Sequence, residues 1–208
     1  MKKTGKDEKK TEDGQAKYFI YVIIFIVLFI AAVLSIRYFW PQKSRAESYS
    51  YNNFIFTNMS GLWFTDVYST RTGALYTVPL HFSPRELGNI TIDGDVNAFK
   101  NKTLVYITFD PTGNEFSYIA LSASELSINL AQTLNITPVA SCTVNVSGVC
   151  TNRPVIDCKK PGESAVYLKY DNVTKIYMEN NCIVVQGKEW ELVKASDRLL
   201  LKWFNVMQ

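Results

Sequence analysis

Histidine is nearly absent from this chain: His81 is the only one among 208 residues. A metal site built on several histidines is therefore excluded, and no Cys-x2-Cys pair of the kind that zinc or redox sites use occurs. The chain also lacks a glycine-rich phosphate loop and a Gly-x-Ser-x-Gly nucleophile elbow. Its net charge is only +3, so there is no broad basic field for nucleic acid. We expect no cofactor and no nucleic-acid partner.

Charge is lacking altogether in one stretch, Tyr18–Ile36. Nineteen uncharged residues in a helix cover about 28 Å, close to the roughly 30 Å hydrocarbon core of a bilayer. Aromatic residues flank the run at both ends, and Pro41 follows it. A buried core helix would need a polar stripe or a shorter run. The pattern therefore predicts a transmembrane helix over residues 18–40, with the lipid bilayer as its first partner.

Two other interpretations of this run remain open. Ser44-Arg45-Ala46 resembles the cleavage site of a secretory signal, but the run exceeds the roughly 7–15 residues usual there. A pilin-type leader cut near Gly14-Gln15 would leave a helix that assembles into a filament, which Lys17 and the dispersed aromatic residues fit poorly. We rank the uncleaved anchor first, the filament subunit second and the cleaved signal third.

Basic residues are distributed unequally around the run. Six precede it and three follow it closely: Lys2, Lys3, Lys6, Lys9, Lys10 and Lys17, then Arg37, Lys43 and Arg45. This asymmetry predicts a single-pass protein of the cell membrane with a cytoplasmic N-terminus and an extracytoplasmic C-terminal domain. We expect a disordered cytoplasmic tail over 1–17, a stalk over 41–50 and a domain over 51–208.

The cysteines agree with that orientation. All four lie far beyond the apolar run, at Cys142, Cys150, Cys158 and Cys182. An even set confined to one part of the chain is typical of disulfides in an oxidising compartment. Four cysteines allow three pairings, of which we favour Cys142–Cys150 and Cys158–Cys182, the second as a tie between two strands of the sheet.

Six Asn-X-Ser/Thr sequons also lie beyond the run. Six of the fifteen asparagines belong to them: Asn58, Asn89, Asn101, Asn135, Asn145 and Asn172. They are candidates for glycosylation of an exported domain. Asparagine, serine and threonine at strand ends and turns are the plainer explanation.

The pattern of the remaining chain favours the α+β class. Short β-branched and aromatic segments alternate with turn residues from Phe54 onward, and Pro79 favours an edge strand. Residues 103–140 read as strand, helix and strand, and residues 165–178 as a hairpin. A final helix is expected over Glu189–Val206, with its apolar residues on one face. We expect a mostly antiparallel sheet covered by two helices.

Asp93-Gly-Asp95-Val-Asn97 has the spacing that begins a calcium loop. Ala98 and Leu104 then stand where such a loop needs glycine and glutamate. A β-turn explains the segment more simply.

His81 is the residue best suited to act as a base near neutral pH. Nothing in the sequence supplies it with a nucleophile, so we expect it on a strand surface or in a partner contact. Four carboxylates could converge as a glycosidase pair, although their spacing does not require it: Asp66, Glu86, Asp110 and Glu125.

Aromatic residues are concentrated between positions 49 and 82, where nine occur. Some must be buried in the core. Those that face outward would form a partner surface or rest at lipid headgroups.

Several stretches resemble a set of membrane-anchored archaeal proteins with a four-cysteine extracytoplasmic domain. The similar segments are Leu121-Ser-Ala-Ser-Glu-Leu-Ser-Ile-Asn-Leu130, Pro138-Val-Ala-Ser-Cys142, Arg153-Pro-Val-Ile-Asp-Cys158 and Asp197-Arg-Leu-Leu-Leu-Lys-Trp-Phe204. The resemblance covers most of the C-terminal domain. It implies an extracytoplasmic archaeal protein and carries no activity or site residues.

Three functions follow as hypotheses. The first is a non-enzymatic envelope or assembly component that acts through protein contacts or self-association. The second is a pilin-like filament subunit, and the third is an anchored hydrolase or ligand-binding protein.

Overall fold

The computed structural model describes residues 8–39, 47–69, 71–113, 116–146, 148–159 and 162–208. The chain divides into two compact units, Met1–Arg45 and Ala46–Gln208. The first unit holds one helix, and the second holds two sheets, two α-helices and two short 3₁₀ turns. The elements are α1 Glu8–Phe39, β1 Glu47–Tyr51, β2 Phe54–Met59, β3 Leu62–Tyr68, β4 Leu75–Leu80, η1 Pro84–Glu86, β5 Ile92–Asp93, η2 Val96–Asn101, β6 Leu104–Phe109, α2 Phe116–Gln132, β7 Thr137–Cys142, β8 Ala165–Tyr170, β9 Lys175–Glu179, β10 Cys182–Gly187 and α3 Trp190–Trp203.

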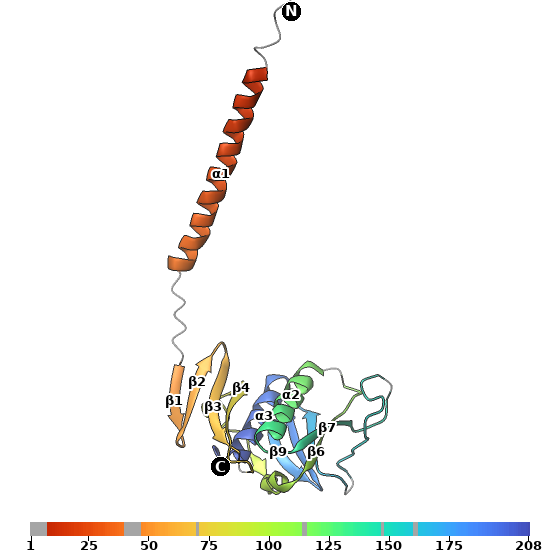
Figure 1. Cartoon of the computed structure of the whole chain (residues 1–208). Coiled ribbons are helices and arrows are strands. Elements are labelled where there is room, and N and C mark those ends of the chain that lie inside the picture. The colour runs from red at the N-terminus through yellow and green to blue at the C-terminus, as the bar shows by residue number, and fades with distance from the viewer. Residues whose placement is uncertain (1–7, 40–46, 70, 114–115, 147, 160–161) are drawn as a thin grey trace, which may run out of the picture. The chain divides into compact units, whose positions relative to one another are not determined.

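Helix α1 contains the predicted apolar segment (Figure 1). Its window Tyr18–Ser35 has a mean hydropathy of 2.8, and its residues are exposed. By length and composition this helix can cross a membrane, as expected from the sequence. An N-terminal signal sequence would meet the same criteria.

The boundaries around α1 differ from those expected. The helix already begins at Glu8, so residues 8–17 of the predicted disordered tail are helical. Once the apolar run has formed its first turns, extension through glutamate, lysine and alanine costs little because nucleation is the unfavourable step. Residues 1–7 and most of the predicted stalk lie outside the described residues, and the end of that stalk, from Glu47, belongs to β1.

The four-stranded sheet is an antiparallel meander in the order β1-β2-β3-β4. Its first two connections are two-residue turns at Asn52-Asn53 and Ser60-Gly61, and all four residues have positive φ. Such turns match the twist of the strands they join, and asparagine and glycine adopt this conformation most readily. β4 lies at the edge, where Pro79 removes no interior hydrogen bond, as predicted.

The six-stranded sheet has the order β5-β9-β10-β8-β6-β7 and is parallel except between β9 and β10. The α+β class is confirmed, and the antiparallel arrangement expected for the whole chain describes the smaller sheet. The larger sheet is mostly parallel because α2 returns the chain from β6 to β7 in the same direction. All six residues of the central strand β10 are buried.

The predicted hairpin over residues 165–178 is wrong. β10 lies between β8 and β9, pairing parallel with the first and antiparallel with the second. The hairpin is instead β9–β10, which turns at Asn180 with a φ of 51°. The most apolar strand takes the central position because both of its faces can then be covered.

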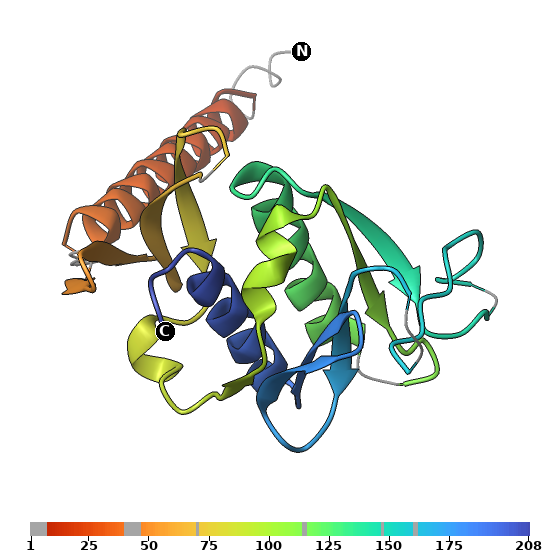
Figure 2. The same ribbon diagram turned by 90° about the horizontal axis from the view of Figure 1, so that it is seen from below.

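Helices α2 and α3 lie side by side on one face of the larger sheet (Figures 1 and 2). Side chains from both helices and both sheets form one continuous apolar core. α3 is buried nearly all round, and its last residue, Trp203, donates from Nε1 to the Val96 carbonyl over 2.9 Å. This helix is therefore the centre of the domain, not a cover on it.

Both disulfides favoured from the sequence are present, Cys142–Cys150 and Cys158–Cys182. The second joins the start of β10 to a turn, whereas a tie between two strands was expected. Cys158, Cys182 and Ala165 form a small second apolar cluster with Ile156 and Tyr167. These side chains cover part of the sheet face opposite the helices.

Gly187, where β10 ends beside α3, gives a first prediction. A Cβ there would lie 2.6 Å from the Leu192 nitrogen and 2.7 Å from the Glu191 carbonyl carbon, both backbone atoms. Gly187→Ala should lower the free energy of unfolding by about 1–3 kcal/mol, because the first turn of α3 must move. Gly88→Ala is the matched control, since a Cβ there meets nothing within 4 Å. Chemical unfolding of the full chain in detergent measures both, and equal effects would contradict this packing.

Candidate functional site

The best candidate site lies just beyond the end of β4, around the single histidine. His81 and Phe82 follow β4, Glu125 comes from α2, and Trp190 and Asp197 come from α3. These segments are far apart in the chain and meet because both helices pack on the same face of the larger sheet.

His81 contacts a carboxylate that is almost completely buried. Its Nδ1 forms a short hydrogen bond with Oε1 of Glu125, whose side chain is only 10% exposed, while that of His81 is 24% exposed. Burial raises the pKa of Glu125, and the hydrogen bond and positive charge of His81 partly oppose that rise. A proton on Nδ1 is donated to Glu125, and Nε2 then has no hydrogen-bond partner among the described residues.

Asp197 lies beneath this pair and is fully buried. Its Oδ2 accepts the Phe82 backbone N–H over 2.8 Å. Burial raises the pKa of Asp197 well above its usual range, and the nearby charge of Glu125 raises it further. Asp197 therefore holds the backbone next to His81 in place.

One oxygen of each buried carboxyl group has no hydrogen-bond partner in the described part of the chain: Oε2 of Glu125 and Oδ1 of Asp197. Two carboxylates that cannot be solvated repel each other, so the pair favours a state in which it holds a proton. The site therefore combines a partly exposed histidine with two buried carboxyl groups that can hold a proton.

Trp190, Phe82 and Tyr118 form an aromatic surface beside His81, called the aromatic wall below. The Trp190 ring is 46% exposed, and its centroid lies 5.8 Å from that of His81, 6.0 Å from Phe82 and 5.4 Å from Tyr118. The Lys194 ammonium lies 5.3 Å from the centroid of Phe82 and is paired with Glu191 at 2.6 Å. His81, Phe82, Trp190, Lys194 and Gly61 line a shallow, open pocket of about 440 Å³.

The chemistry available in this pocket is that of a histidine and an aromatic surface. Its described lining includes no serine, threonine or cysteine that would act as a nucleophile. No group of three or more histidine, cysteine, aspartate or glutamate side chains is placed to hold a metal within the described ranges. The geometry suits recognition, or activation of a water by His81.

Of the two places expected for His81, the strand surface is wrong and the partner contact stays a prediction. His81 lies past the strand, partly buried and bound to Glu125, and not on a strand surface. Of the four carboxylates considered, Glu125 alone joins it. Glu86 accepts from the backbone N–H and hydroxyl of Ser83, and Asp66 accepts from Thr77.

Asp197 was missed because its helix was expected to be buried on one face only. In the structure α3 is buried on nearly every side, so a charged residue outside the predicted apolar face also lies in the core. The available signal was that Val193 and Leu201, four residues before and after Asp197 and hence on its side of the helix, are apolar.

The other residues singled out in the sequence are the calcium-like segment, the aromatic residues near position 50 and the sequon asparagines, and they lie outside this site. Asp95 accepts from the Asn97 backbone N–H at the start of η2, which supports the turn interpretation of the calcium-like segment. Tyr49 stacks on Phe56 and packs edge-on against Trp63, whereas Tyr68 is exposed. The sequon asparagines are exposed except for the half-buried Asn58: Asn89, Asn101, Asn135, Asn145 and Asn172.

Comparison with known proteins identifies no relative. No family model, curated protein or solved structure matches the chain. The resemblance to archaeal membrane-anchored proteins stays a prediction.

The raised pKa values of the carboxyl pair predict a pH-dependent stability. A carboxyl group whose pKa is higher in the folded than in the unfolded chain, where aspartate has about 3.9, stabilises the fold fully below the unfolded value. That contribution is lost as the pH rises through the folded pKa. The free energy of unfolding should therefore fall from about pH 4 upward, and less steeply in Asp197→Asn, which cannot ionise.

Urea unfolding of the detergent-solubilised full chain at several pH values, followed by tryptophan fluorescence, measures this slope. Asp66→Asn is the control, because Asp66 is an exposed aspartate of the smaller sheet. An Asp197→Asn slope equal to that of the unsubstituted protein would contradict the assignment of the raised pKa values to this pair.

Proposed function

We propose that the chain is a single-pass membrane protein with a cytoplasmic N-terminus, and that its disulfide-bonded, glycosylated outer domain binds another envelope protein. The apolar helix supports membrane attachment, and the two disulfides suit an oxidising compartment. The unequal distribution of lysines supports the orientation. Exposure of five of the sequon asparagines is compatible with glycan attachment.

The observation that carries the binding role is the half-exposed Trp190 at the centre of the aromatic wall. Tryptophan is the residue type most enriched among those that dominate protein–protein binding energy. The Trp190 ring is already supported by three aromatic neighbours, so little side-chain freedom is lost when a partner covers it.

The pocket shape supports a macromolecular partner. It is shallow and open, whereas sites for small substrates usually enclose most of the ligand. A protein segment presenting an apolar or aromatic side chain would cover Trp190 and Phe82, and its polar atoms would meet His81 and Lys194 at the rim.

A second candidate is an anchored hydrolase, favoured by the bond between His81 and Glu125. His81 would act as general base toward a water, Glu125 would orient its ring, and Asp197 would position its backbone. Loss of a hydrolytic activity in His81→Gln, with unchanged partner binding, would favour this candidate.

Cross-linking on intact cells tests the first proposal. A membrane-impermeant reagent should join the tagged full chain to a partner, and Trp190→Ala should lower the yield at least about tenfold. Tyr68→Ala is the matched control, because Tyr68 is a 72% exposed aromatic residue of β3 that does not line the pocket.

Equal yields with the two variants would contradict binding through Trp190. Failure of the reagent and of added protease to reach the C-terminal domain would contradict the orientation. A mature N-terminus near Gln15 would replace the anchor with the filament subunit.

A further inference from the structure

A second cavity, separate from the His81 pocket, lies at the carboxyl ends of the parallel strands β6 and β8. It has a volume of about 470 Å³. Cavities that bind small organic ligands measure roughly 300–1,000 Å³. Its size alone makes it a candidate, and its position in the sheet strengthens the case.

The strand order explains why a cavity forms there. Phe109 of β6 pairs with Leu168 of β8, so the chain leaves both strands at the same level of the sheet. From β6 it runs through α2 to β7 on one side, and from β8 it runs toward β9 and β10 on the other. The two connections diverge and leave a crevice, which is where open sheets of this kind bind ligands.

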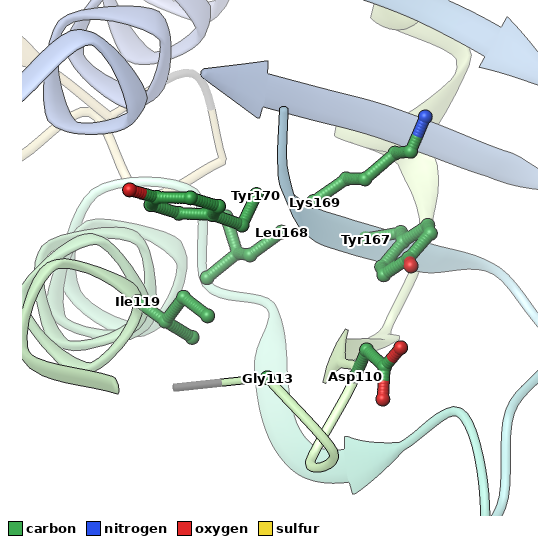
Figure 3. Close-up of a pocket in the computed structure, with 7 residues that line it drawn as sticks. All are labelled: Asp110, Gly113, Ile119, Tyr167, Leu168, Lys169 and Tyr170. Atoms are coloured by element: carbon green, nitrogen blue, oxygen red, sulfur yellow. The ribbon is translucent and has the colours of Figure 1, made fainter. Parts of the chain in front are cut away.

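The cavity has one apolar side. Ile119 of α2 and Leu168 of β8 are buried, and Tyr170 lies beside them (Figure 3). This side can pack against an apolar or aromatic group of a ligand.

The opposite side is acidic. Asp110 and Tyr167 lie together across the opening in Figure 3. Burial raises the pKa of Tyr167; the charge of Asp110 raises it further, and the charge of Lys169 opposes that rise. The nearby cation Lys169 is held by Asp171 at 2.8 Å, and its ammonium is turned away from Asp110 in Figure 3.

We propose that this cavity binds a small organic ammonium compound with an aromatic or apolar group. Its ammonium would lie between the Asp110 carboxylate and the Tyr167 ring, through ionic and cation–π attraction. Its apolar group would pack on the half-buried Tyr170 ring beside Ile119. A carboxylate ligand of the same shape would meet Asp110 with the wrong charge.

Calorimetric titration of the full chain in lipid nanodiscs tests this, with empty nanodiscs as the blank. The probes are tyramine and 4-hydroxyphenylacetate, which share a phenol ring and differ in the sign of their charge. Tyramine should bind at least about tenfold more tightly than the anion. Equal affinities, or no tyramine binding at millimolar concentration, would overturn the proposal.

Two variants of the protein, each with one aspartate replaced, test the role of Asp110. Asp110→Asn removes the charge and keeps an oxygen to accept from the backbone N–H and hydroxyl of Thr112, as Asp110 does. It should weaken tyramine binding about tenfold. Asp66→Asn, another exposed aspartate that accepts from a threonine hydroxyl, should leave it unchanged. Unchanged affinity in Asp110→Asn would also overturn the proposal, and the comparison of the two probes does not depend on how well either variant folds.

Discussion

The unit Ala46–Gln208 depends on one interaction, in which the buried carboxyl group of Asp197 accepts the Phe82 backbone N–H. It joins the central helix α3 to the end of the smaller sheet and sets the position of His81. The side chain is fully buried and one of its oxygens has no partner among the described residues, which is costly unless the carboxyl group is protonated. A carboxyl group with a purely structural role would be expected to have both oxygens paired. The unpaired oxygen of Asp197 is therefore a reason to place the functional site around it.

The two halves of the domain carry different kinds of site. Around His81 the surface is open and aromatic, with Trp190 supported by its neighbours, and this suits contact with another protein. At the carboxyl ends of β6 and β8 the cavity is more enclosed and has an apolar and an acidic side. α2 contributes to both, through Glu125 at the first and Ile119 at the second.

Features that depend on neighbouring residues were predictable from the sequence. The apolar run of α1, the periodic helix α2, the edge strand with Pro79 and both short-range disulfides were expected and are present. Strand order was not, because the insertion of β10 between β8 and β9 depends on burial in the finished fold. The site was not predictable either, since Asp197 lies 115 residues from Phe82 and the two meet only when α3 packs in the core.

Hydrogen exchange of the Phe82 amide tests the role of Asp197 most directly. If its N–H is held by the buried carboxyl group, it should exchange as slowly as the amides of α3, which open only when the domain unfolds. In Asp197→Ala its exchange should accelerate far more than that of Thr65, a buried residue of β3. Fast exchange of Phe82 in the unsubstituted protein would contradict the account.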